Sequence, residues 1–429
     1  MFKTGPIIHQ DISPCFLYGA LSDEQFVIAR NTADSAFRAV GRNAENRMLP
    51  FLEAPFNEEC IEKAESVVSH FRKFESVLVI GTGGSSLGAR TMTSLLQSWV
   101  MADNAFPKLY FLDNLDAEIF WEIMSIVNPK TTGVIAVSKS GETAETLIQV
   151  MRCIEYWSGI IDIGTLSEQF LFITEPKNNF LRKIAAHFGI KCMDHPTNIG
   201  GRFSCFSLGS ILPPMIIGFD VRKFFHGAAS TCNQIFLGRL RAPIDGAALA
   251  LALYNTKNIR THVFFPYGDA FSSFTFWCRQ LIAESIGKNG VGFTPVYGMG
   301  PVDQHSQLQL YMDGPDDKLF TVLFEKQVAR ERLSPNTWDF LPSLRPFAIS
   351  AIADLVSAQC NATCQALMKK KRPVRILCVH VLNEQTLGAL MMNFIIETLI
   401  TAEIFHVDPL TQPSVEIGKK IALDALSKR

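Results

Sequence analysis

Short apolar runs alternate with helix-length segments along most of this 429-residue chain. Each run has the length and the β-branched or aromatic content of a buried strand, and turn-forming residues bound it. The runs cover residues 77–80, 109–112, 134–137, 170–173, 262–265, 321–324 and 376–381. Segments such as 87–100, 144–157 and 274–286 lie between them. This alternation predicts an α/β fold with parallel sheets that helices cover on both faces.

The length of the chain indicates two domains, because a single hydrophobic core stops growing at roughly 250–300 residues. The composition shifts between residues 225 and 245, which places a boundary there. We therefore expect a first doubly wound α/β domain over residues 70–230 and a second over residues 245–410. Residues 1–65 are expected to form a mainly helical segment on the second domain, and residues 411–429 a C-terminal helix.

The composition excludes several classes of protein. With 40 basic and 41 acidic side chains the net charge is −1, which predicts no binding to nucleic acid or to an anionic membrane. The first residues lack a signal peptide, so we expect a cytoplasmic protein. The apolar stretch 387–405 contains Asn393, Glu397 and Glu403, which favours a buried helix over a membrane span. Ten cysteines without a CxxC pair predict reduced core thiols and no metal site.

The sequence Gly-Thr-Gly-Gly-Ser-Ser at residues 81–86 follows an expected strand and precedes an expected helix. Glycines let the backbone approach a ligand, and the amides of a first helical turn attract an anion. Gly84 and Ser85 are therefore candidate phosphate-binding residues. The dinucleotide fingerprint GxGxxG is matched only in part, because Ser86 replaces its third glycine, and no GxxxxGK[ST] sequence occurs.

A second hydroxyl-rich turn, Ser-Lys-Ser-Gly-Glu-Thr at residues 138–143, has the same position between strand and helix. Ser138, Ser140 and Thr143 could donate hydrogen bonds to phosphate oxygens, and Lys139 could add positive charge. The same hydroxyls could instead only cap the helix. Two such turns at the ends of successive strands favour a shared phosphate pocket, because open α/β sheets bind ligands at that edge.

Four further motifs follow in order: Gly-Gly-Arg-Phe-Ser at 200–204, Glu-Ser-Ile-Gly-Lys at 284–288, Asp-Gln-His-Ser at 303–306 and Val-Glu-Ile-Gly-Lys at 415–419. With the two turns, they make the chain resemble the phosphoglucose isomerase family, which is built from sugar-isomerase (SIS) modules. The resemblance runs in blocks between residues 76 and 420. It implies reversible isomerisation of glucose 6-phosphate and fructose 6-phosphate through a cis-enediol, without metal or organic cofactor.

The resemblance also implies roles for individual residues. Glu284 matches the base of the family, and Arg202 matches the arginine beside the developing enediolate. His305 and Lys419 match the residues that open the sugar ring, and Gln280, one helical turn before Glu284, matches a substrate contact. The family further implies a homodimer with shared active sites, in which His305 reaches the site of the neighbouring subunit.

The chain departs from the family pattern at two places. Glu142 stands in the phosphate turn where relatives usually carry a small hydroxyl residue. Its carboxylate would repel a phosphate, so either the side chain faces solvent or phosphate affinity is reduced. Pro413-Ser414 precedes Val415 where the family often has a Gln-x-Gly sequence, so the loop near Lys419 is expected to differ.

Two alternative functions stay open. An isomerase for another phosphosugar would share both phosphate turns. Only Gln280 and the loop between residues 288 and 305 could then distinguish it from a glucose-6-phosphate isomerase. A non-catalytic SIS-type sensor would retain Ser85 and Ser138 but would not need Glu284. Such a sensor would also be expected to carry a basic DNA-binding segment, and the N-terminal region lacks that character.

Overall fold

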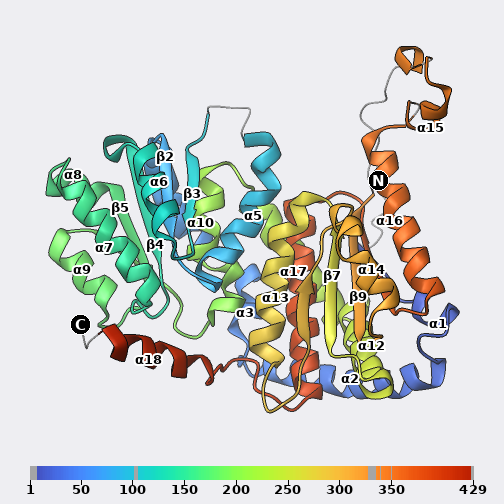
Figure 1. Ribbon diagram of the computed structural model, residues 1–429. Helices are drawn as coiled ribbons and strands as arrows, with labels where there is room; N and C mark the ends of the chain where they lie inside the picture. Colours follow the sequence, from blue (N-terminus) through green and yellow to red (C-terminus); the bar gives the residue numbers. More distant parts are fainter. Residues whose placement is uncertain (1–6, 101–104, 327–334, 339, 349, 427–429) are drawn as a thin grey trace.

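The computed structural model describes residues 7–100, 105–326, 335–338, 340–348 and 350–426. Two five-stranded sheets lie side by side, with helices between them and on their outer faces (Figure 1). This arrangement confirms the predicted α/β class with parallel sheets covered on both faces.

The first sheet is parallel throughout, with the order β3-β2-β4-β5-β6. Its strands are β2 (Ser76–Ile80), β3 (Lys108–Leu112), β4 (Thr132–Val137), β5 (Phe170–Thr174) and β6 (Lys191–Asp194). Its outer face packs against α6 (Ala117–Ile126), α7 (Ala144–Ser158), α8 (Ile163–Gln169) and α9 (Phe180–Phe188). Ile80 lies beside Leu112 and Ala136, so the turns after β2 and β4 leave the same edge of the sheet.

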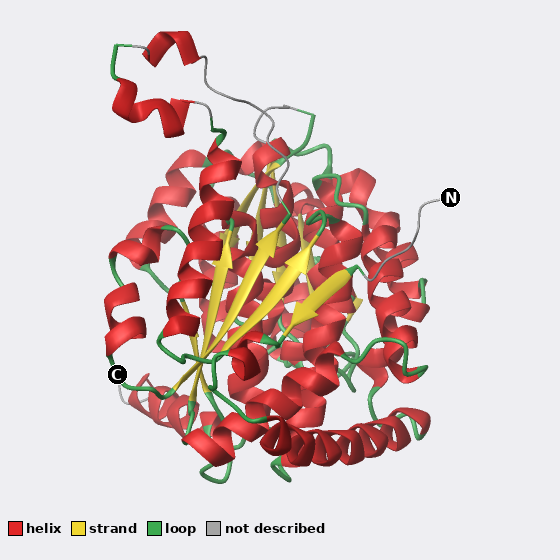
Figure 2. Ribbon diagram, turned by 90° about the vertical axis from the view of Figure 1, so that its right-hand side faces the viewer, coloured by secondary structure: helices red, strands yellow, loops and turns green. Residues whose placement is uncertain are grey.

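The second sheet has the order β1-β10-β9-β7-β8. Its strands are β1 (Ile8–Asp11), β7 (Thr261–Tyr267), β8 (Thr294–Tyr297), β9 (Lys318–Glu325) and β10 (Val374–Val379). Strand β1 runs antiparallel to β10, whereas the other neighbours are parallel, so the N-terminal segment supplies an edge strand as well as helices. The outer face packs against α14 (Leu308–Asp313) and α16 (Ile352–Lys369), and Figure 2 shows the strands fanning out.

The N-terminal helices contact both halves of the molecule. They are α1 (Pro14–Leu17), α2 (Asp23–Glu45), α3 (Pro50–Glu53) and α4 (Glu59–Phe71). Helix α2 starts with a capping box, in which Ser22 and Gln25 each accept a hydrogen bond from the other's backbone amide. It packs against the second half, whereas α4 packs beside the first sheet.

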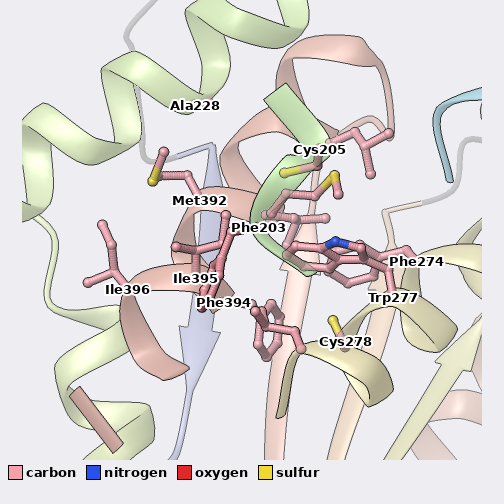
Figure 3. Packing of buried hydrophobic residues seen from close by; sticks show 14 of the residues in the cluster. Phe203, Cys205, Ala228, Phe274, Trp277, Cys278, Met392, Phe394, Ile395 and Ile396 are labelled. Carbon is pink, nitrogen blue, oxygen red and sulfur yellow. The ribbon is translucent and has the colours of Figure 1, made fainter. Parts of the chain in front are cut away.

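Six helices fill the space between the sheets: α5 (Gly84–Val100), α10 (Leu208–Ile216), α11 (Val221–Phe236), α12 (Ala242–Lys257), α13 (Ser272–Ile286) and α17 (Glu384–Ile404). One continuous hydrophobic cluster joins Val79 of the first sheet to Leu323 of the second. Figure 3 shows Phe203, Trp277 and Phe394 among the buried side chains of this cluster. The inner faces of the two sheets therefore share a core.

Helices α11 and α17 cross at very short range. A Cβ atom on Gly227 would lie 1.9 Å from the carbonyl oxygen of Gln385, and one on Gly388 would lie 2.0 Å from that of Phe224. Only glycine fits at these two positions. By length and composition α17 could cross a membrane, but it is buried in the centre of the molecule, as predicted for residues 387–405.

Two helices lie away from the main body. The short helix α15 (Arg345–Ala348) belongs to a segment that projects from the second half (Figures 1 and 2). Helix α18 (Val415–Leu426) runs along the lower side of the first half in the view of Figure 1. All ten cysteines are free thiols, as the sequence indicated.

Candidate active site

The glycine-rich turn after β2 packs directly against the segment that carries Arg202. A Cβ atom on Gly84 would lie 2.2 Å from the carbonyl carbon of Gly201, so any larger residue would separate the two segments. The hydroxyl of Ser204 donates to the carbonyl oxygens of both Gly84 and Gly201, at 3.1 and 2.7 Å. The turn and the arginine segment thus form one rigid unit, with Ser85 on the first turn of α5.

Arg202 lies on a 3₁₀ helix, η3 (Gly201–Phe206). The next side chain, Phe203, is buried and stacks on Phe51 with ring centroids 4.2 Å apart, which fixes the direction of the segment. The Arg202 side chain is only 2% exposed. Burial lowers the pKa of Arg202, and the Glu284 carboxylate opposes this shift. A guanidinium remains charged in such a setting because its unperturbed pKa is so high.

The guanidinium of Arg202 is saturated with acceptors. It donates to Glu284 Oε2 at 3.0 Å. Its other acceptors come from the end of α13 and from the segment after α17: Ser285 Oγ, the carbonyl oxygens of Pro409 and Thr411, and Gln412 Oε1. A cation held by so many acceptors has a fixed position and costs little to keep there during a reaction.

Glu284 lies on the last turn of α13, and both of its carboxylate oxygens have partners. Arg202 binds Oε2, and the amide of Gln280 donates to Oε1 at 2.9 Å. The side chain of Glu284 is 29% exposed, so the carboxylate is open to a ligand. Gln280 lies against the glycine-rich turn, and its Oε1 is buried without a hydrogen-bond partner. The structure therefore brings Gly84, Arg202, Gln280 and Glu284 into one cluster.

The second predicted turn lies between β4 and α7. The hydroxyls of Ser138 and Thr143 are 2.9 Å apart, and Ser138 also accepts from the amide of Gly141 at 3.2 Å. Ser140 accepts from the amide of Glu142 at 3.1 Å, while the Glu142 side chain is exposed. The Glu142 side chain therefore faces solvent, so water would weaken, without abolishing, the repulsion between its carboxylate and a phosphate in this turn.

Sequence reasoning missed a carboxylate beside this turn. Glu175 follows β5, is nearly buried, and lies 3.5 Å from the ammonium of Lys139 and 2.7 Å from that of Lys177. The Glu175 carboxylate raises the pKa of Lys177. Its position one residue after a parallel strand was the available signal, because such positions gather at the ligand-binding edge.

His305 ends the short 3₁₀ helix η5 (Val302–His305), and its side chain is exposed. The neighbours of His305 anchor this helix to the second half. Asp303 accepts from the amide of Met299 at 2.6 Å, and Gln304 donates to the hydroxyl of Tyr267 at 2.7 Å. The scaffold around His305 is thus ordered while the imidazole itself faces outward.

Lys419 lies on α18 and is 61% exposed. Its ammonium forms an ion pair with Glu416 at 2.8 Å. Within the described part of this single chain, neither Lys419 nor His305 hydrogen-bonds to the side chain of Glu284 or Arg202. The structure therefore gathers Gly84, Arg202 and Gln280 around Glu284 and leaves these two on the surface.

Two residues near Glu284 were not predicted. Gln412 contacts the guanidinium of Arg202 through its side-chain oxygen. Lys288 donates to the carbonyl oxygens of Glu284 and Ser285 at 2.9 and 2.8 Å, and it reaches Asp408 as well. Lys288 is the last residue of the Glu-Ser-Ile-Gly-Lys motif, and Gln412 comes directly before Pro413-Ser414. In the sequence, only their places beside these motifs indicated that the two residues lie near the site.

The fold and the site define an α/β protein of the sugar-isomerase type. Residues 27–294 match the phosphoglucose isomerase family. A glucose-6-phosphate isomerase from Carboxydothermus hydrogenoformans is 31% identical over 412 residues, which cover 92% of this chain and 88% of the relative. Another from Rubrobacter xylanophilus is 30% identical over 377 residues, covering 86% and 87%. The chain belongs to the phosphoglucose isomerase family.

Two solved structures share the fold of this chain. A hypothetical protein from Thermus thermophilus has a TM-score of 0.85 at 26% identity, and the match covers 98% of this chain and 99% of that one. A glucose-6-phosphate isomerase from Chlamydia trachomatis shares the fold with a TM-score of 0.67 at 21% identity, covering 92% and 78%. The family resemblance drawn from the motifs is confirmed.

Proposed function

We propose that this chain catalyses the reversible isomerisation of D-glucose 6-phosphate and D-fructose 6-phosphate. The observation that carries the proposal is the partly open carboxylate of Glu284, bound by Arg202 at 3.0 Å and by Gln280 at 2.9 Å. Two relatives that match 86% and 92% of the chain bear the name glucose-6-phosphate isomerase, which supports this choice of substrate.

The proton transfer is assigned to Glu284. Isomerisation moves a proton between C1 and C2 of the open-chain sugar, and one carboxylate that reaches both carbons can remove the proton and return it. Such general-base catalysis contributes roughly 10²–10⁴-fold to the rate. The intermediate is a cis-enediol, whose developing negative charge would lie beside the guanidinium of Arg202. Losing one well-placed donor of this kind costs about 2.7–4 kcal/mol of transition-state stabilisation.

Phosphate binding is assigned to the two turns. Ser138, Ser140 and Thr143 would donate hydroxyl protons to the phosphate oxygens, with Lys139 supplying positive charge at the rim. Gly84 and Ser85 would contribute from the start of α5. The turns follow β2 and β4, which are neighbours in the first sheet, and this supports a common pocket for them.

Ring opening is assigned to His305 and Lys419. Both side chains are exposed in the single chain, so we propose that the complete site forms in a homodimer, where His305 acts on the substrate of the neighbouring subunit. Exposed apolar side chains support an interface: Phe340 in the projecting segment is 76% exposed, and Ile352 at the start of α16 is 85% exposed. We also infer a cytoplasmic location, in keeping with ten free thiols.

A coupled assay tests the proposed function. Fructose 6-phosphate is supplied to the purified protein, and the glucose 6-phosphate formed is measured by its oxidation with NADP⁺-dependent glucose-6-phosphate dehydrogenase. Turnover with fructose 6-phosphate that exceeds turnover with mannose 6-phosphate in a matched assay would support the assignment. A protein that converts only another phosphosugar, or none, would refute it.

A further inference from the structure

Lys288 directs its ammonium group at three backbone carbonyl oxygens near Glu284. It donates to Glu284 and Ser285 in the last turn of α13, at 2.9 and 2.8 Å, and to Asp408 at 2.6 Å. Three donors thus meet three acceptors. A cation at the C-terminal end of a helix is also stabilised by the helix dipole. Lys288 therefore joins the helix that carries Glu284 to a segment 120 residues further along the chain.

The segment that Lys288 holds also contains acceptors of Arg202. Residues 408–412 follow α17 and form no helix or strand. Arg202 donates to the carbonyl oxygens of Pro409 and Thr411, at 2.6 and 3.0 Å, immediately after the residue that Lys288 binds. Two cations therefore fasten this short segment to the end of α13 from two directions.

This arrangement links the position of Arg202 to Lys288. Arg202 contacts Glu284 with one nitrogen and the 408–412 segment with others, so movement of the segment would pull the guanidinium away from the carboxylate. Burial lowers the pKa of Lys288, and the nearby Arg202 cation lowers it further. The Arg202 and Lys288 cations can lie close together because both are bound by backbone carbonyl oxygens of residues 408–411, and Arg202 also by the Glu284 carboxylate.

We propose that Lys288 is a positioning residue, which holds the 408–412 segment so that Arg202 faces the enediolate formed at Glu284. The inference rests on the proposed function and adds a residue outside the set that acts on the sugar. Lys288 would affect the transition state more than the bound substrate, because Arg202 stabilises charge that appears only during proton transfer. Misplacement by about 1 Å can cost up to roughly 100-fold in rate.

The test compares Lys288→Met with Lys288→Arg. Lys288→Met should lower kcat at least about tenfold and change KM by less than about threefold, and Lys288→Arg should recover part of the loss. Lys257→Met is the matched control, since Lys257 pairs with Asp316 at 2.8 Å on another part of the molecule. The control should retain the wild-type kcat.

A binding measurement separates positioning from general damage. A five-carbon aldonic acid phosphate carries a carboxylate that resembles the enediolate, whereas glucose 6-phosphate carries none. In Lys288→Met, affinity for the acid should fall by about the same factor as kcat while affinity for glucose 6-phosphate stays the same. Equal losses for both ligands, or a wild-type kcat, would overturn the inference.

Hydrogen exchange tests the role of Lys288 independently of the proposed catalytic function. In Lys288→Met, amides of residues 405–412 should exchange faster, while those of β2 and β4 should not change. An inactive wild-type protein would overturn the proposed function, and unchanged exchange in residues 405–412 would still overturn the role given to Lys288.

Discussion

Arg202 and Glu284 form an ion pair of 3.0 Å in which the arginine is buried and the glutamate is partly open to solvent. The buried arginine is therefore the fixed part of the site, and the glutamate is the part that a ligand can reach. The guanidinium is held by its other acceptors whether or not Glu284 is charged, so neutralising Glu284 should leave the structure of the site intact.

Glu284→Gln should therefore abolish most turnover without preventing binding. The substitution keeps the size of the side chain and removes its basicity, so kcat should fall by at least about 10²-fold. The affinity for glucose 6-phosphate, measured by calorimetric titration, should stay within a few-fold of the wild type. The exposed Glu118→Gln is a suitable control and should be fully active. Near-normal turnover of Glu284→Gln would remove Glu284 as the proton carrier.

The phosphate turn should respond in opposite directions to two substitutions. Glu142→Thr removes negative charge close to the proposed phosphate position, so KM for fructose 6-phosphate should fall while kcat stays about the same. Because the Glu142 side chain is exposed, solvent screening should limit the effect to a few-fold. Ser138→Ala removes a donor and should raise KM. Steady-state kinetics decide both, and an unchanged KM in the two variants would mean that this turn does not hold the phosphate.

A mixture of two inactive variants should recover activity if His305 acts across a dimer. Subunits with Glu284→Gln and subunits with His305→Ala reassort at random, so half of the dimers are mixed and each mixed dimer has one intact site of two. About a quarter of the wild-type activity should then appear. Differential tags would establish that mixed dimers form. Mixed dimers no more active than their parents would show that His305 does not act in trans.

Acid should destabilise the fold through His262. This side chain is buried in β7, pairs with the hydroxyl of Thr321 at 2.7 Å and stacks on Phe264. Burial lowers the pKa of His262 to about 3 from an ordinary 6.5. Below pH 6.5 the unfolded chain binds a proton at His262, whereas the native chain does not until the pH nears 3. The contribution of neutral His262 to the free energy of unfolding is therefore fully present above pH 6.5. It declines by about 1.4 kcal/mol per pH unit below it.

Thermal melting of the wild type and of His262→Gln between about pH 7.5 and pH 5 would measure this contribution. The glutamine variant should have the lower Tm at neutral pH, because it loses the packing on Phe264, but its Tm should fall less steeply with acid. Parallel curves for the two proteins would show that His262 does not couple folding to pH.

The central strands of both sheets and the edge strand β3 could be predicted from the sequence, whereas three other edge strands could not. β1, β6 and β8 have four residues each and stand at the edges of the sheets. A strand with one neighbour need not be apolar on both faces, so Lys191 and Asp194 in β6 hide the pattern that marks β2 or β4.

The same limit applies to the site. Gln280 and Glu284 are one helical turn apart, so their contact follows from local spacing. The hydrogen bonds of Arg202 to Thr411 and Gln412 span more than 200 residues, and that of Lys288 to Asp408 spans 120. Contacts of this kind depend on how the two sheets pack, and no local pattern in the sequence records them.

The shared hydrophobic cluster between the sheets restricts how this molecule can move. Hinged rotation of one half against the other would expose Phe203, Trp277 and Phe394 to water, at about 25 cal/mol for each Å² of apolar surface. We therefore expect surface loops to move when substrate enters and product leaves, while the two halves keep their relative position. A chain cut between α11 and α12 would leave this apolar surface bare on both pieces, and neither half should stay in solution alone.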